Sequence, residues 1–198
     1  RPDLRIPTQS SPTGTQYLQA VGVALGAKKD GTDEVVYVSS GEGATSEGEF
    51  FEAINWAARE SLPVIFFVQD NRLAISVPVE NQTAGGSVYD VVSGFKGLER
   101  FDVDGSNFLD VYAAMQTAVR RARRGEGPSL IHANVVRLLP HSSSDDQLKY
   151  RAKDDVERDK AKDPIPKMTH FIIEEGYITD KGAAELQAEV REAVDAAA

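Results

Sequence analysis

The sequence predicts one α/β domain in which a parallel sheet is flanked by helices. Short apolar, β-branched segments alternate with helix-like segments along the chain. The apolar segments are continuous, as in strands that are covered on both faces. A length of 198 residues is enough for one domain with its own core. We expect a single domain over 1–198, with a mobile loop at 140–152 and a C-terminal helical extension at 153–198.

The first expected elements are a helix and two strands. Residues 15–29 are mainly small or apolar and end in lysines, which is typical of a helix. Residues 34–39 form a β-branched run, and 63–69 (PVIFFVQ) form a continuous apolar run. Both runs predict buried strands.

Between these strands, residues 47–61 predict an amphipathic helix, because Phe50 and Ile54 lie four positions apart on one side. Ser46 with Glu49 three residues later is the pattern of a capping box. We therefore expect the helix to begin at Ser46.

The next elements continue the alternation. Residues 88–95 predict a short helix, 99–103 a strand, 107–124 a long helix and 129–136 a further strand.

The last part of the chain has a different character. Residues 141–151 are polar and turn-rich, and 151–162 are typical of a solvated loop. Two prolines precede an amphipathic stretch at 167–175, and the Ala- and Glu-rich segment 181–198 predicts a helix. The extended, Pro-containing start and the alanines at the end indicate a piece of a longer polypeptide.

Composition excludes several classes of protein. The net charge is −9, from 22 basic and 31 acidic residues, which argues against nucleic acid or an anionic membrane as partner. The longest apolar run, 64–68, is too short to cross a membrane. Without cysteine there is no disulfide, thiolate nucleophile or cysteine–zinc site. We expect a cytoplasmic protein.

A glycine loop follows the first expected strand. Gly41 and Gly43 would let backbone N–H groups approach an anion, and the following helix N-terminus would attract it. The carboxylate of Glu42 would repel a phosphate unless a hard cation such as magnesium lay between them. Alone the loop is a weak signal, and it matches neither the dinucleotide fingerprint nor the P-loop.

The second strand strengthens this interpretation. It ends in Asp70-Asn71-Arg72-Leu73. Because neighbouring parallel strands end at the same edge of the sheet, Glu42 and Asn71 should meet there. The backbone carbonyl of Leu73 could supply a third ligand.

These two segments resemble the thiamine diphosphate-binding motif. More narrowly, they resemble the α subunit of the decarboxylating component of 2-oxo acid dehydrogenase complexes, in which Glu42 and Asn71 have the expected spacing of 29 positions (71 − 42). The stretches 10–16 and 137–151 resemble that family too. The resemblance implies a thiamine diphosphate-binding fold.

The resemblance also implies site residues. Magnesium would be held by Glu42, Asn71 and the Leu73 carbonyl. The residues that would border the cofactor are Ser11, Thr13, Gly41, Gly43, Ala44 and Ile75. The residues that match a potassium-binding turn are Ser10, Pro12, Thr15 and Gln16.

Further residues of the resemblance lie in the polar loop. His141 corresponds to a histidine at the mouth of the site, near diphosphate and substrate, and is the candidate catalytic residue. Ser142 corresponds to a serine that kinases phosphorylate in mitochondrial relatives. The residues that match the ordering network of this loop are Arg137, Asp145, Tyr150 and Arg151.

Two departures bear on affinity for the diphosphate. Asp70 replaces the first Asn of the family's usual pair, and Gln69 stands where branched-chain members often place an Arg. Of the other histidines, His132 lies in an apolar strand and is expected to be a hydrogen-bonded core residue, and His170 is expected to lie on the surface of a helix.

The implied function is oxidative decarboxylation of a branched-chain 2-oxo acid, with acyl transfer to a lipoyl group. A β subunit in an α2β2 assembly and a lipoyl-bearing acyltransferase component are the implied partners, and the isolated fragment is expected to be inactive. Alternatives are a pyruvate or acetoin dehydrogenase α subunit and a non-catalytic assembly module. A serine hydrolase would use Ser46, near a nucleophile-elbow pattern, with His141.

Overall fold

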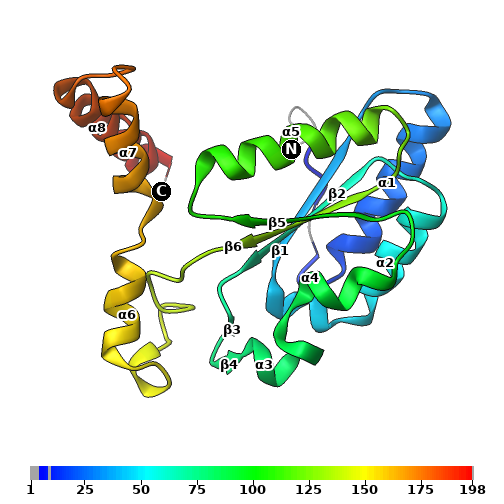
Figure 1. The fold of residues 1–198 in the computed structure, drawn as a ribbon, viewed down its shortest axis with the longest axis horizontal. Coiled ribbons are helices and arrows are strands. Elements are labelled where there is room, and N and C mark those ends of the chain that lie inside the picture. Colours follow the sequence, from blue (N-terminus) through cyan, green and yellow to red (C-terminus); the bar gives the residue numbers. More distant parts are fainter. Residues whose placement is uncertain (1–4, 9, 198) are drawn as a thin grey trace.

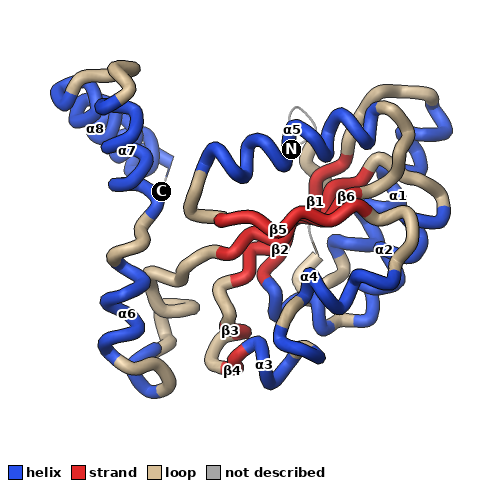
Figure 2. The backbone as a smooth tube through the Cα atoms, in the orientation of Figure 1, coloured by secondary structure: helices blue, strands red, loops and turns tan. Residues whose placement is uncertain are grey.

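The computed structural model describes residues 5–8 and 10–197. Its centre is a four-stranded sheet in the order β1-β2-β6-β5, in which every neighbouring pair is parallel (Figures 1 and 2). The strands are β1 (Val36–Gly41), β2 (Val64–Asp70), β5 (Glu99–Asp104) and β6 (Ser129–Asn134). The predicted parallel α/β class is confirmed.

Helices cover both faces of the sheet, which explains why β2 is apolar at successive positions. Phe66 and Val68 pack in the core beneath the helices α1 (Gln16–Asp30) and α2 (Gly48–Arg59). Ile65 and its neighbours on the opposite face pack against α5 (Phe108–Arg123), which lies across the other side of the sheet in Figure 1. Successive side chains of a strand point to opposite faces, so a strand between two helical layers needs no polar alternation.

The predicted capping box is wrong. Residues Glu42–Ser46 form a 3-10 helix, and α2 begins at Gly48 with Glu47 as its N-cap and without a side-chain cap hydrogen bond. Because Ser46 is the last residue of this 3-10 helix, it is not the N-cap of α2. The loop is fastened instead by Thr45, whose hydroxyl donates to the Glu42 carbonyl over 2.7 Å.

A compact segment between β2 and β5 was only partly anticipated. The predicted helix 88–95 is present as α4 (Val88–Val91) followed by the 3-10 turn η4 (Val92–Gly94). Ahead of it lie elements that the sequence did not single out: β3 (Leu73–Ala74), β4 (Val77–Pro78), α3 (Val79–Gln82) and η3 (Ala84–Gly86). The hairpin of β3 and β4 follows β2 directly and lies beside the glycine loop.

The C-terminal part is helical and stands to one side of the sheet in Figure 1. Its elements are the turn η5 (Gln147–Lys149) and the helices α6 (Lys153–Lys160), α7 (Pro164–Glu174) and α8 (Asp180–Ala197). The solvated loop expected at 151–162 is wrong, because α6 occupies most of it. Acidic residues in its first turn and basic residues in its last turn stabilise this helix, although only Val156 is buried.

None of the helices in the described part of the chain combines the length and apolar character needed to cross a membrane.

Candidate functional site

The carboxyl ends of the strands meet at one edge of the sheet. Gly41 at the end of β1 lies in register with Gln69, and Asp70 at the end of β2 lies in register with Asn134 of β6. The glycine loop and the turn after β2 therefore leave the sheet side by side. This is the edge at which open α/β sheets bind their ligands.

Glu42 and Asn71 meet as predicted. The backbone N–H of Asn71 donates to Glu42 Oε2 over 3.3 Å, while Glu42 Oε1 has no hydrogen-bond partner among the described residues. Glu42 is only 1% exposed. Burial raises the pKa of this carboxyl above its usual value, and hydrogen bonds from backbone N–H groups offset only part of that rise. A buried carboxylate with one unpartnered oxygen is suited to a cation.

The turn after β2 leaves two further oxygens available. Asn71 Oδ1 accepts the Leu73 N–H over 3.2 Å and retains a second lone pair. Because the Val79 N–H donates to the Arg72 carbonyl, Leu73 and Pro78 form the non-hydrogen-bonded pair of the hairpin, and the Leu73 carbonyl points away from β4. The structure thus gathers the side chains of Glu42 and Asn71 and a carbonyl that the hairpin ladder does not use.

The approach to the glycine loop is tight. A Cβ atom on Gly43 would lie 2.8 Å from Ala74 Cβ, so only glycine fits without displacement of the hairpin. Gln82 of α3 also reaches this place, and its buried Nε2 lacks a partner among the described residues. Sequence reasoning missed Gln82, because nothing in its surroundings along the chain distinguishes it from an ordinary helix residue.

Ile75 is held in an unusual conformation. Its φ is +56°, a left-handed value that is strained for a bulky β-branched residue, and the residue is 54% exposed. Arg137 Nη1 donates to the Ile75 carbonyl over 2.6 Å. Strain of this kind is concentrated at functional sites and persists only where surrounding contacts maintain it.

The polar loop is connected to Ile75 through Arg137. Arg137 Nη2 donates to Tyr150 Oη over 2.7 Å, and the Tyr150 hydroxyl donates to Asp145 Oδ2 over 2.5 Å. The same Asp145 oxygen accepts the His141 N–H over 2.9 Å. Hydrogen bonds from Tyr150 and His141 hold the pKa of Asp145 below its usual value. His141 is exposed on this loop, and the described contacts bring its backbone, not its ring, into the network.

The N-terminal turn lies beside the end of the glycine loop. Ser10 Oγ hydrogen-bonds Thr15 Oγ1, and Thr15 Oγ1 donates to the Pro12 carbonyl over 3.0 Å. A Cβ on Gly14 would lie 2.8 Å from Glu47 Cβ, so the turn packs against the start of α2.

The structure does not gather every predicted residue. Ser11 and Thr13 are exposed on the N-terminal turn, without a hydrogen bond to Gly41–Ala44 within the described residues. Gln16 begins α1 and lines a groove beside β1, away from Glu42.

His132 is the hydrogen-bonded core residue that the sequence predicted. It is 3% exposed, its Nε2 lies 2.9 Å from Asp70 Oδ2 and its Nδ1 lies 2.8 Å from Asp102 Oδ1. Burial favours the neutral ring, but the hydrogen bonds to Asp70 and Asp102 outweigh it and raise the pKa of His132 above its usual value. Ser46, by contrast, makes no hydrogen bond to a histidine in the described part of the chain, so the hydrolase alternative has no geometric support.

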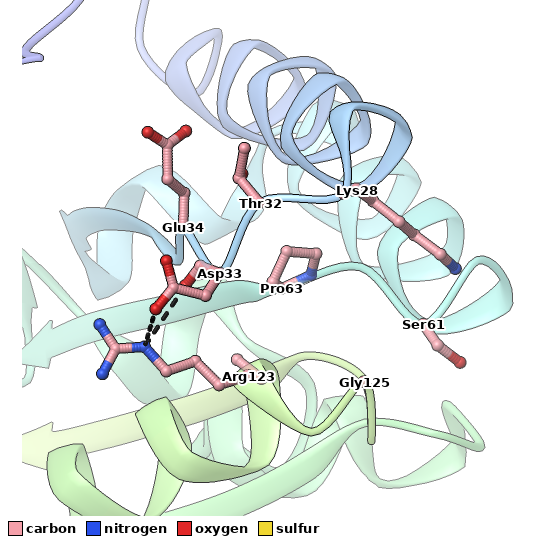
Figure 3. Close-up of a pocket in the computed structure, with 10 residues that line it drawn as sticks. Lys28, Thr32, Asp33, Glu34, Ser61, Pro63, Arg123 and Gly125 are labelled. Carbon is pink, nitrogen blue, oxygen red and sulfur yellow. Dashed lines mark hydrogen bonds and ion pairs between the residues drawn. The ribbon is translucent and has the colours of Figure 1, made fainter.

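Two hollows lie away from the carboxyl edge. One of about 620 Å³ flanks β1. The other, of about 200 Å³, lies at the amino end of the sheet, where Arg123 Nε donates to the Asp33 carbonyl over 3.3 Å (Figure 3). Across the described residues there is no group of three or more His, Cys, Asp or Glu side chains that could hold a metal. A metal at the carboxyl edge would therefore depend on mixed ligands and on oxygens from a bound molecule.

The chain matches a known protein family along its whole length. Residues 1–198 match the family described as "Dehydrogenase E1 component". The chain belongs to this family. Among its relatives, 2-oxoisovalerate dehydrogenase subunit alpha of Bacillus subtilis (strain 168) is 42% identical over 98% of this chain and 59% of that protein. 3-Methyl-2-oxobutanoate dehydrogenase subunit alpha of Mycobacterium tuberculosis (strain CDC 1551 / Oshkosh) is 41% identical over 93% of this chain and 52% of that protein.

A second kind of E1 relative is almost as similar. Pyruvate dehydrogenase E1 component subunit alpha of Bacillus subtilis (strain 168) is 40% identical over 91% of this chain and 49% of that protein. The E1-family chain thus spans about half the length of the curated relatives it matches. Transketolase from Campylobacter jejuni subsp. jejuni NCTC 11168 shares the fold with a TM-score of 0.52 and 25% identity, over 63% of this chain and 20% of that chain. A Mycobacterium smegmatis protein whose structure is titled as thiamin diphosphate-dependent has the same TM-score at 27% identity, over 64% and 22%.

Proposed function

We propose that this E1-family chain supplies the magnesium and diphosphate half of a thiamine diphosphate site. The enzyme would oxidatively decarboxylate a branched-chain 2-oxo acid and pass the acyl group to a lipoyl group. The observation that carries the proposal is the contact between Asn71 and the buried Glu42, whose second oxygen has no partner among the described residues. The names of the 2-oxoisovalerate and 3-methyl-2-oxobutanoate dehydrogenase relatives support a branched-chain substrate.

The donor set fits magnesium bound to a diphosphate. Magnesium takes one or two protein carboxylates together with phosphate oxygens, and here Glu42, the Asn71 amide and the Leu73 carbonyl would be the protein's ligands. Gly41, Gly43 and Ala44 would border the diphosphate. The loop has no room for a side chain at Gly43, where a Cβ atom would collide with Ala74.

The exposed Ile75 would lie along the rest of the cofactor, as would Ser11 and Thr13 on the N-terminal turn. The turn made by Ser10, Pro12 and Thr15, with Gln16, would hold potassium. Thiamine diphosphate, when bound, supplies the carbanion and the electron sink of the reaction.

The partners follow from the same proposal. The relatives are named as alpha subunits, so the remaining walls of the site would come from another polypeptide. A β subunit in an α2β2 assembly would complete it, and a lipoyl-bearing acyltransferase component would receive the acyl group. The segment 1–198 alone would then be inactive. His141 would face the substrate at the mouth of the site.

The test is binding of thiamine diphosphate to the full-length protein, measured by calorimetry across a magnesium titration. Glu42→Ala should abolish the magnesium-dependent part of binding. Glu52→Ala, at an exposed position on α2, should bind like the unmodified protein. Equal binding by all three proteins would refute the site.

The substrate class needs its own assay. The complete assembly should turn over branched-chain 2-oxo acids faster than pyruvate. A clear preference for pyruvate would replace the branched-chain proposal with the pyruvate alternative, which the 40% identical relative keeps open. Cofactor binding without turnover of any 2-oxo acid by the complete assembly would favour the assembly-module alternative.

A further inference from the structure

A buried polar network lies behind the turn that carries Asn71. Asp70 ends β2, is 1% exposed and uses both of its carboxylate oxygens. Its Oδ1 accepts the Arg72 N–H over 2.7 Å, and its Oδ2 lies 2.9 Å from His132 Nε2. The Asp70 carbonyl accepts the Val135 N–H over 2.9 Å. Asp70 therefore links the backbone of the metal-binding turn to β6.

The network continues to the edge strand. His132 Nδ1 lies 2.8 Å from Asp102 Oδ1 on β5, and that oxygen also accepts the Asn134 Nδ2–H over 2.7 Å. A continuous chain of hydrogen bonds thus joins Asp70, His132 and Asp102 across the three adjacent strands β2, β6 and β5, whose places in the sheet can be followed in Figure 1.

The turn needs such support because its conformation is uncommon. Arg72 has a φ of +69°, in the left-handed region, between the residues that would offer Asn71 Oδ1 and the Leu73 carbonyl. The Asp70 carboxylate holds the Arg72 N–H in place, and His132 fixes the orientation of that carboxylate. A rotation of Asp70 would release the turn and move both ligand oxygens.

The buried Asp70 carboxylate also needs His132 as a hydrogen-bonding partner, 2.9 Å away. A buried carboxylate is costly unless it is paired and hydrogen-bonded. Arg72 also lies near Asp70, but its Nη1 is 4.0 Å from Asp70 Oδ2 and its side chain is 47% exposed. His132 is therefore the principal partner of this carboxylate.

We propose that Asp102, His132 and Asp70 act as positioning residues that fix the turn 70–73, so that it presents two oxygens to the metal. This inference depends on the proposed function, because it concerns how the magnesium ligands are held. None of the three residues touches the metal or the cofactor in this proposal. They act through the Asp70 contact to the Arg72 backbone.

The first experiment removes the middle of the network. In the full-length protein with its partner subunit, His132→Leu should raise the magnesium concentration for half-maximal thiamine diphosphate binding by about tenfold, the usual effect of losing an outer-shell partner. Saturating magnesium should restore binding. Adding Asp70→Asn should recover part of the loss, because the amide keeps the Arg72 contact without a stranded charge. His170→Leu, at an exposed histidine on α7, is the matched control and should change nothing.

The second experiment keeps the test decisive if His132→Leu does not fold. The Asp102 side chain is 51% exposed on the edge strand, so its variants leave the core intact. Asp102→Ala should raise the half-saturating magnesium concentration severalfold. Asp102→Asn should behave like the unmodified protein, because the amide oxygen still accepts from His132 and Asn134.

The outcomes separate the inference from the proposed function. If the unmodified protein shows no magnesium-dependent binding, both are overturned. If it binds normally, and His132→Leu and Asp102→Ala lower only the melting temperature while the half-saturating magnesium concentration stays unchanged, the network merely stabilises the sheet and the inference alone is overturned. A rise in that concentration with Asp102→Ala, absent with Asp102→Asn, supports it.

Discussion

Without bound cofactor, Glu42 should lower the stability of the folded protein. Its pKa is raised by burial, so ionising it costs the folded state free energy at neutral pH. Glu42→Gln should therefore stabilise the cofactor-free protein by about 1–3 kcal/mol at pH 7, because the amide removes the buried charge, which costs more than a neutral polar group. For a chain of this size, each kcal/mol corresponds to roughly 2–4 °C in melting temperature.

The pH dependence has a definite sign. A carboxyl with a raised folded-state pKa reduces stability above that pKa, and the reduction disappears once both states are protonated. The advantage of Glu42→Gln should thus be largest at neutral pH, shrink as the pH falls, and vanish below the ordinary glutamate value of about 4.3. Differential scanning fluorimetry of the two proteins across this range measures it.

Cofactor should reverse the order of stability. Magnesium and thiamine diphosphate at about 1,000 times the dissociation constant should stabilise the unmodified protein by about 4.1 kcal/mol and leave Glu42→Gln unaffected. The control is Glu52→Gln, at an exposed position, which should follow the unmodified protein throughout. A Glu42→Gln protein that melts lower without cofactor, or whose advantage is the same at pH 4 and pH 7, would refute this reasoning.

Three further predictions concern the surroundings of the site. Gly43→Ala should lower cofactor affinity by at least tenfold, because its methyl group would collide with Ala74 and displace the hairpin. Gly26→Ala, which has open space around it, should bind cofactor like the unmodified protein. Calorimetry compares the two variants, and equal affinities would show that Gly43 is not needed for the site. Arg137→Ala should loosen the loop at 141–151 by removing its link to the Ile75 carbonyl, which faster proteolytic cleavage there would reveal and unchanged cleavage would contradict. Ser142→Asp adds negative charge near the diphosphate and should weaken cofactor binding, most at low salt; tighter binding would argue against this location of the loop.

The layered part of the fold could be predicted from sequence because its signal is local. The continuous apolar run 63–69 is short and rich in β-branched and aromatic residues, which favours a strand covered on both sides, and the strand observed at Val64–Asp70 is buried between α5 and the α1–α2 layer. The predicted start of α2 and the predicted loop at 151–162 were wrong because the local sequence pattern there was weak or competed with another one. Ser46 has a good capping sequence but is recruited into the 3-10 turn, and α6 has too narrow an apolar face to stand out.

Part of the candidate site could likewise be predicted from the sequence, and part could not. The meeting of Glu42 and Asn71 follows from two strand ends and a parallel sheet, so sequence alone could supply it. The partnership of Asp70 with His132 spans 62 positions and depends on the register between β2 and β6, which no local pattern encodes. The strained conformation of Ile75 was equally hidden, because it depends on a two-residue hairpin turn and on Arg137.

The most direct test of the central claim is a crystal structure of the full-length protein with its partner subunit, thiamine diphosphate and magnesium. We predict a metal ion at about 2.0–2.1 Å from a Glu42 carboxylate oxygen, Asn71 Oδ1 and the Leu73 carbonyl, with diphosphate oxygens completing its coordination. A metal and diphosphate bound elsewhere, with Glu42 Oε1 still without a ligand, would contradict the account.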